Sequence, residues 1–438
     1  MVNTAHLEVL FSSEWNEWRT HNEGVIPDFT SANLSGKDLS GRDLRGADFT
    51  NADLTGATLA TANFNKALFR NTKLLAVDLT RAVLTNVNLT GADLRQSVLK
   101  GVNLSTSTLN NANLESVNLE GANLEGASLE AANLRDTNCS RANLRRVYLK
   151  GSGFDGAIFE EADLQEIAFD YLRLPGANLR GANLTDSSLK YADFRDADLR
   201  RAKLIRAKLV QTNFSGANLS GVDFEKADIL EANFDLAWLT DAQFVGTRLE
   251  KVSLVGAVIK GANFEKSKLN ANMTGMDLRV AKFAGATFGG SNLSQVDMRR
   301  MSLPGVSFKN SRLVDARMAE MNLENTSFED AELTGASMRG VNLNNANLNG
   351  STMALADLTA ASLLNARLQE VKLERADLRF AKLNKANLER ADLTRCNLTG
   401  TDFTDANLAN TNFWAAKVKN AKLDVGLKWK LLFLMFRY

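Results

Sequence analysis

The sequence predicts an all-β protein in which parallel strands wind into one long coil, a β-solenoid. Three observations favour this fold: a five-residue repeat, glycines concentrated at one position of the repeat, and two Pro-Gly pairs at that corner. A period of five fits neither a helix, which has about 3.6 residues per turn, nor a strand, with a period of about two. A short extended stretch followed by a tight turn does fit it. Each repeat should therefore form one side of the coil.

The repeat is plainest near its start, where Ala32-Asn33-Leu34-Ser35-Gly36 is followed by Lys37-Asp38-Leu39-Ser40-Gly41. Each repeat reads small, polar, apolar, and then two turn residues. Apolar residues recur at every fifth position from Phe29 to Leu269, and again from Met273 to Leu423, so one residue is missing between the two runs. This loss should tighten or break one corner.

Glycine marks the corners of the predicted coil. By position, 25 of the 29 glycines stand fifth in the repeat, where a type II turn requires positive φ. Pro175-Gly176 and Pro304-Gly305 place Pro and Gly at the two central turn positions, as this turn type prefers. Right-angled corners would close the coil after four sides, which gives about 20 coils in all.

This A(D/N)LxG-type repeat resembles the pentapeptide-repeat family over about nine-tenths of the chain. The resemblance implies a right-handed quadrilateral parallel β-helix, with the apolar and small positions facing inward and the turn residues facing outward. The handedness and the square section come from the resemblance alone. The stretch Trp15-Asn16-Glu17-Trp18-Arg19, followed by Pro27-Asp28-Phe29, also resembles the leader of many bacterial members of the family.

Four segments are expected: a helical cap over residues 1–26, a first stack over 27–270, a second stack over 271–423, and an apolar cap or dimer contact over 424–438. A solenoid end exposes an apolar cross-section that needs a cap. In the first segment Leu7, Phe11, Trp15 and Trp18 share one face at helical spacing, which predicts a single amphipathic helix over the first coil. The missing residue at the stack boundary either kinks the coil or separates two domains.

The apolar tail is too short to span a bilayer, which takes about 20 residues. A cap on the last coil is the first interpretation, because capping is physically required. A symmetric homodimer through this end is the second, since members of the resembled family often pair that way, and contact with a membrane surface is the third. The candidate end contacts are Trp15, Trp18, Trp429, Leu432, Phe433 and Phe436.

A run of apolar residues between 205 and 255 departs from the pattern, because most of them stand where Ser, Thr, Gly or a charged residue is usual. A contiguous exposed apolar patch is typical of an interaction surface; the alternative is a local adjustment of the turns. The candidate protein-binding wall comprises Ile205, Val210, Leu230, Leu236, Trp238, Val245 and Val255.

Outward charges form pairs when the chain is folded at four repeats per coil. Arg141 then faces Glu161, Arg146 faces Glu166, and Asp186 faces Arg206, and such cross-strand pairs are mildly stabilising. These pairs indicate charge ladders that stabilise the stack of coils. They do not indicate a binding patch. Cys139 and Cys396 both fall at inward positions, which predicts two buried thiols that act as small hydrophobes.

Catalysis finds little support in the sequence. The only histidines, His6 and His21, precede the repeats, so the solenoid offers no base for a Cys-His or Ser-His-Asp arrangement. No zinc spacing or phosphate loop is present, and a flat outer wall should provide no water-excluding pocket. We expect no enzyme, no cofactor and no metal.

The expected function is a rigid, non-catalytic scaffold or adaptor that binds protein in the bacterial cytoplasm. The 52 basic and 51 acidic residues leave a net charge of +1, which predicts no binding to nucleic acid. The alternative is a DNA mimic that binds DNA gyrase, as in the quinolone-resistance members of the resembled family. Duplex DNA carries one charge per about 1.7 Å, so a rod of about 96 Å would need about 56 negative charges. The charge balance argues against this alternative.

Overall fold

The structure is a computed structural model that describes residues 3–423 of the chain. The chain divides into two compact units, Met1–Ala227 and Asp228–Tyr438. The expected C-terminal segment 424–438, with Trp429, Leu432, Phe433 and Phe436, lies outside the described residues. The predicted stack boundary at 270/271 remains a prediction.

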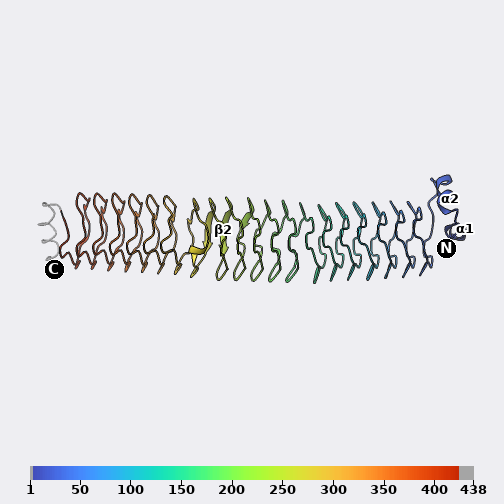
Figure 1. The fold of residues 1–438 in the computed structure, drawn as a ribbon, viewed down its shortest axis with the longest axis horizontal. Helices are drawn as coiled ribbons and strands as arrows, with labels where there is room; N and C mark the ends of the chain where they lie inside the picture. The colour runs from blue at the N-terminus through green and yellow to red at the C-terminus, as the bar shows by residue number, and fades with distance from the viewer. Residues whose placement is uncertain (1–2, 424–438) are drawn as a thin grey trace. The chain divides into compact units, whose positions relative to one another are not determined.

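The first unit begins with two short helices, α1 (Thr4–Leu10) and α2 (Trp15–His21), at the blue end of the chain in Figure 1. The second unit contains β1 (Asp228–Leu230), β2 (Arg248–Ser253) and β3 (Lys268–Asn272), which form a parallel sheet in the order β1-β2-β3. The 3₁₀ helix η1 (Leu278–Val280) follows them. Most other repeats contribute one isolated parallel bridge, because each side is extended over very few residues.

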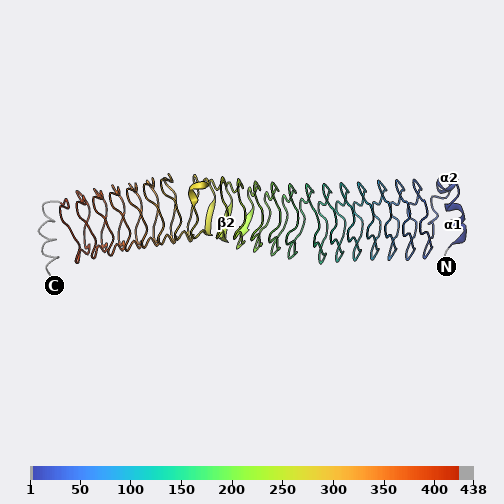
Figure 2. The ribbon, with the colours of Figure 1, turned by 60° about the horizontal axis from the view of Figure 1, so that its bottom comes forward.

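One turn of the coil takes four repeats in each unit. In the first unit Asn33 pairs with Asp53, and in the second Ser337 pairs with Asp357; both bridges are parallel. Within each unit, Figures 1 and 2 show successive turns lying one beside the next. The predicted five-residue sides are therefore confirmed, and with them a β-helix-like fold.

Each position of the repeat has a physical task that the first repeats illustrate. Ala32 and Leu34 are buried and fill the interior. The outward Asp28 accepts a hydrogen bond of 3.0 Å at Oδ1 from the backbone N–H of Thr30, which is the Asx turn that Asp and Asn favour. The N–H of Ala32 donates to the carbonyl of Phe29 at 3.0 Å and closes the corner.

The corner position adopts positive φ whether or not it holds glycine. All 25 glycines assigned to corners do so, but many corners hold other residues, among them Leu236, Leu355 and Phe380 with φ of 59°, 61° and 59°. A left-handed residue other than glycine costs about 1–2 kcal/mol. Because most corners are also held by ladder hydrogen bonds, the stack tolerates this cost. The coil itself thus imposes positive φ at its corners, and glycine only lowers the energetic cost of that conformation.

The missing residue is absorbed locally in the second unit. Glu250 pairs with Asn270, but Val252 pairs with Ala271, so Lys251 forms a β-bulge in β2. Gly275 forms the next corner, with φ of 74°. At the corner after it stands Val280, whose β-branched side chain disfavours positive φ, and the chain forms η1 there instead of the usual turn. Ladder hydrogen bonds are present on both sides of the missing residue, from Leu269 N to Thr287 O at 2.7 Å and from Met273 N to Asn292 O at 2.9 Å.

Candidate functional site

The N-terminal cap consists of two helices, so the prediction of one continuous amphipathic helix is wrong. The chain leaves the helical conformation between Leu10 and Trp15. As a result Leu10 is buried, whereas Phe11 is 46% exposed. Trp15 is fully buried, stacks on Trp18 with ring centroids 5.2 Å apart, and contacts Phe29, the first apolar residue of the solenoid.

Side chains of α2 also pair with the backbone edge of the first turn. The Asn16 side chain accepts from the N–H of Asp43 at 2.8 Å and donates to the carbonyl of Gly41 at 3.2 Å. Trp15 Nε1 donates to the carbonyl of Asp43 at 2.9 Å, and Arg19 Nη2 to that of Arg45 at 2.8 Å. These groups would otherwise need a preceding turn of the coil. The N-terminal helices therefore supply hydrogen-bond partners to the exposed backbone edge of the first turn and also cover its apolar end.

The ladder is interrupted once in the regular part of the first unit. Residues 147–156 and 167–176, all of which the structure describes, are joined by no bridge and by no backbone hydrogen bond. The repeats that flank this interruption are still paired with the next turn, since Asn143 pairs with Asp163 and Ile158 with Asn178. We call the space between 147–156 and 167–176 the ladder gap.

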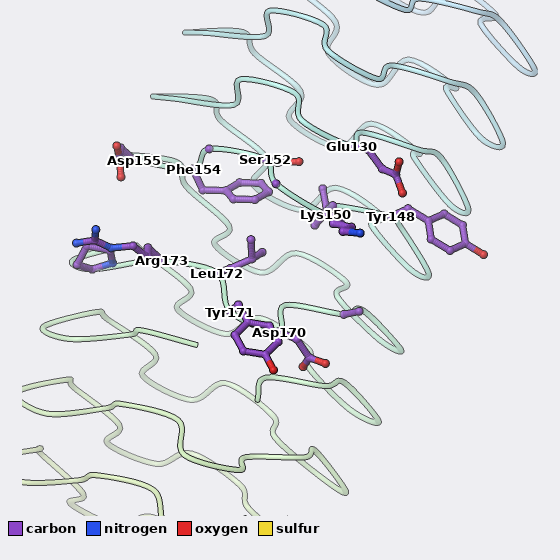
Figure 3. A pocket seen from close by; sticks show the side chains of 15 residues that line it. Glu130, Tyr148, Lys150, Ser152, Phe154, Asp155, Asp170, Tyr171, Leu172 and Arg173 are labelled. Carbon is purple, nitrogen blue, oxygen red and sulfur yellow. The ribbon is translucent and has the colours of Figure 1, made fainter. Parts of the chain in front are cut away.

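The ladder gap is a half-open hollow of about 990 Å³. Figure 3 shows the side chains of Phe154 and Leu172 between the two separated turns. Both are almost fully buried, while Tyr148 and Tyr171 at the rim are 63% and 72% exposed. The outer wall is therefore hollowed at this place, although the hollow is open to water.

Side-chain volume and backbone freedom explain the opening. Leu172 stands at an inward position that usually holds Ala, Ser, Thr or Val, and it faces Ser152 of the preceding turn by repeat register. Forcing extra methylene groups into a packed interior displaces the backbone. Gly153, at the outward position beside Ser152, weakens the strand that would have to hold the turns together. A large residue at an inward position is a sequence signal for such a site, but it does not suffice, because the ladder is intact beside Met321 at an equivalent position.

A second hollow lies in the second unit, beside an exposed apolar patch. Leu236 and Trp238 are 66% and 56% exposed. Leu236 covers Gly256, where an added Cβ would lie 2.8 Å from Leu236 Cδ2, and Trp238 pairs with Val258 in the ladder. A hollow of about 430 Å³ continues from Val258 to Val280. We call the group of exposed apolar side chains beside this hollow the apolar patch. It comprises Leu236, Trp238, Val255, Val258 and Val280.

The structure places the seven residues of the predicted wall in different surroundings. Leu236, Trp238 and Val255 are exposed and belong to the apolar patch. Leu230 and Val245, also in the second unit, are half-buried, and the partner of Leu230 in the next turn is the charged Glu250. In the first unit Ile205 and Val210 are half-buried. Sequence reasoning missed Val258 and Val280. Val258 stands at an outward, usually polar position one turn after Trp238, so its register could have revealed it, whereas Val280 follows the missing residue.

The predicted charge ladders are present. Arg141 Nε lies 2.9 Å from Glu161 Oε2, Arg146 Nε lies 2.7 Å from Glu166 Oε2, and Arg206 Nη2 lies 2.5 Å from Asp186 Oδ2. Hydrogen bonds from the arginine side chains hold the pKa values of these carboxyl groups below their usual range. Exposed pairs of this kind stabilise a protein only weakly.

The groups that catalysis or metal binding would use are dispersed. Burial raises the pKa of the Cys139 and Cys396 thiols to about 12, so neither is a thiolate at neutral pH. Within residues 3–423, no three His, Cys, Asp or Glu side chains gather as metal ligands would. In the same part of the chain, no helix has the length and hydrophobicity needed to cross a membrane.

Comparisons with solved structures find repeat proteins. HetL of the cyanobacterium Nostoc sp. strain PCC 7120, a pentapeptide repeat protein involved in heterocyst differentiation regulation, is 30% identical over 56% of this chain and 94% of its own, with a TM-score of 0.25. Rfr23 of the cyanobacterium Cyanothece 51142 is 29% identical over 33% and 97%, with a TM-score of 0.14. QnrB1, a plasmid-mediated fluoroquinolone resistance protein, is 20% identical over 49% and 92%, with a TM-score of 0.23.

No curated protein matches the sequence significantly. The sequence profile described as "Pentapeptide repeats (8 copies)" matches overlapping segments that together span residues 28–59, 62–300 and 302–424. These matches cover almost all of the repeats counted in the sequence. The chain belongs to the pentapeptide repeat family.

Proposed function

We propose that the protein is a non-catalytic scaffold that binds another protein through the apolar patch. The observation that carries this proposal is a group of exposed apolar side chains on neighbouring turns. Trp238 pairs with Val258 in the ladder, Leu236 covers Gly256, and Val258 and Val280 line the same hollow. Soluble proteins rarely leave such residues together in water without a use. A central Trp flanked by aliphatic side chains is also the composition typical of interface hot spots.

The surroundings of the patch favour a protein over a small molecule. Its hollow is open, and Leu236 and Trp238 are more than half exposed, so a small ligand would remain largely in water. Lys260 and Asp277 stand at its edge with opposite charges, as at the polar rim of a protein interface. The two buried thiols support the non-catalytic part of the proposal.

Several finer expectations belong to the same proposal. The coil is a right-handed quadrilateral β-helix of about 20 turns, the protein acts in the bacterial cytoplasm, and residues 424–438 cap the last turn or pair with a second copy. A gyrase-binding DNA mimic is disfavoured, because acidic side chains alternate with basic partners along the ladders. Glu120, for example, lies 3.1 Å from Lys100.

The test compares two substitutions at equivalent corner positions. Leu236→Asp places a charge in the apolar patch, and Leu355→Asp makes the same change at an equally exposed corner with positive φ outside it. Asp tolerates positive φ, so both variants should fold. A partner captured from host lysate by wild type and by the Leu355 variant, but lost with the Leu236 variant, supports the proposal.

The captured partner is then purified and titrated by calorimetry against all three proteins. Burial of the apolar patch should give a negative heat-capacity change and an affinity at least about tenfold weaker for Leu236→Asp, which corresponds to about 1.4 kcal/mol. Equal affinity for the three proteins would exclude the patch. Inhibition of gyrase supercoiling by the wild type, falling steeply with salt, would instead revive the DNA-mimic alternative.

A further inference from the structure

We propose that the ladder gap binds an extended segment of a partner protein, which inserts as an additional parallel strand between residues 147–156 and 167–176. The site is separate from the apolar patch, and the proposal does not depend on it. It rests on the unpaired backbone groups along both sides of the gap, on the side chains between them, and on the cause of the opening.

The backbone groups that border the gap are those that an intact ladder would pair. In the intact ladder nearby, Leu144 N donates to Asp163 O at 2.7 Å and Asp163 N to Ala142 O at 2.9 Å. Across the gap, all within the described residues, the corresponding donors and acceptors make no such bond. In one direction the pattern would join the N–H groups of the first turn to carbonyl groups of the second: Leu149 to Ala168, Gly151 to Asp170, Phe154 to Arg173 and Gly156 to Pro175. In the other direction it would join the N–H groups of Ala168 and Arg173 to the carbonyl groups of Val147 and Ser152.

Each bordering turn is still held by its other neighbour. Leu129 N donates to Tyr148 O at 2.8 Å on one side, and Phe169 N donates to Ser188 O at 2.7 Å on the other. Both edges are therefore ordered, extended and parallel, and they face each other. A strand edge with unpaired groups is a template for another chain, and addition of a strand is an established mode of peptide recognition. Here one segment can pair on both sides.

The side chains of the gap indicate what such a segment carries. Phe154 and Leu172 lie between the turns, where every second side chain of an inserted strand would point. The ring of Phe154 contacts that of Phe169 across the gap, with centroids 6.0 Å apart. Apolar side chains of an inserted strand would pack against this layer of side chains. The rim carries Glu130, Lys150, Asp155, Asp170 and Arg173. This mixture of signs gives no attraction for a strongly charged ligand and suits a near-neutral peptide.

A partner segment fits the gap better than a second copy of the solenoid does. Strand insertion needs a chain whose backbone groups are free on both sides. The repeats of a second copy are already paired with the turns before and after them over most of both units. A loop or terminus of another protein carries no such pairing.

The experiment uses the full chain and two matched variants. Leu172→Ala combined with Gly153→Asn restores the usual residues at the inward and outward positions and should close the gap. Met321→Ala makes a similar change at an inward position where the ladder is intact, since Ser302 pairs with Asn322. Amide hydrogen exchange should show fast exchange at Leu149, Phe154, Ala168 and Arg173 in the wild type and in Met321→Ala, and slow exchange in the closed variant.

The probe is a phage-displayed library of random linear heptapeptides, selected on the wild type. Peptides with alternating apolar residues should be enriched, should slow exchange at the four amides named above, and should bind the closed variant at least about tenfold more weakly than Met321→Ala, or about 1.4 kcal/mol. Because the exchange test uses the wild type, it holds even if the closed variant does not fold.

Three results would overturn the proposal. Slow exchange at the four amides in the free wild type would mean that the ladder is closed in solution. Failure to enrich peptides, or equal binding to the closed variant, would mean that the gap is no peptide site. Concentration-dependent self-association that disappears in the closed variant would assign the gap to a second copy of the chain. None of these results bears on the apolar patch, which Leu236→Asp tests separately.

Discussion

The indole Nε1 of Trp15 lies 2.9 Å from the carbonyl oxygen of Asp43, 28 residues later in the chain. The Asn16 side chain, next to it, accepts from the N–H of the same Asp43 at 2.8 Å. Two neighbouring residues of α2 therefore take the place of a ladder strand at the edge of the first turn. The cap closes the solenoid through hydrogen bonds as well as through apolar contact.

Removal of the Trp15 hydrogen bond should destabilise the first unit. Trp15→Phe keeps a ring against Phe29 but leaves the half-buried carbonyl of Asp43 without its donor, which should cost about 1 kcal/mol. Trp15→Ala also removes the packing and should cost about 3–5 kcal/mol. Chemical denaturation followed by circular dichroism measures both. If the two variants were equally stable, the ring contact would contribute nothing.

Two glycines at corners separate backbone strain from steric conflict. Gly305 has φ of 70° and open space around a built Cβ, so Gly305→Ala should cost only the left-handed penalty of about 1–2 kcal/mol. Gly400 has φ of 72°, and a built Cβ would lie 2.8 Å from Cδ1 of Phe380. Gly400→Ala should therefore cost more, as measured by thermal unfolding. Addition of Phe380→Ala should bring the cost down to that at Gly305; an unchanged cost would refute the steric explanation.

The charge ladders predict a small loss of stability in acid. Hydrogen bonds from Arg146 and Arg141 lower the pKa of Glu166 and of Glu161. Because the folded-state pKa is below the unfolded value of about 4.3, the stabilisation is complete above that value and is lost as pH falls through the folded pKa. Glu166→Gln should lower the melting temperature slightly at pH 7 and leave it unchanged near pH 2.

Arg146→Gln combined with Glu166→Gln provides the control for that effect. If the pair interaction causes the difference, the double variant should lose no more stability than either single variant loses. Molar salt should reduce the difference at pH 7, since screening weakens exposed pairs. An effect that persisted at low pH would have to come from the glutamate side chain's packing and not from its charge.

Both thiols should be unreactive in the folded protein. Burial raises the pKa of Cys139 and Cys396 to about 12, and reagents that need a thiolate would also need access to the interior. Titration with a chromogenic disulfide at pH 8 should detect no free thiol in the native state and two after unfolding in guanidinium. Rapid reaction of one thiol in the native protein would show that its turn of the coil opens.

The sequence alone determined the five-residue sides, the inward and outward positions, the corners, and the ion pairs between residues one turn apart. These features could be predicted because a solenoid repeats one local geometry, so that counting along the chain is equivalent to measuring along the stack. Arg146 and Glu166 illustrate this: their contact follows from their separation in the sequence. Likewise, Ala32 and Leu34 are buried because of their positions in the repeat.

Only the tertiary structure decided where this regularity fails and what lies exposed as a result. Leu172 has an ordinary apolar side chain, but it stands opposite Ser152 of the preceding turn, and the ladder between these two turns is open. Val258 becomes part of an apolar patch because Trp238 pairs with it and the chain beyond forms η1. Such outcomes depend on the fit between side chains of neighbouring turns. That fit is a property of packed volume, and the pattern within a single repeat does not contain it.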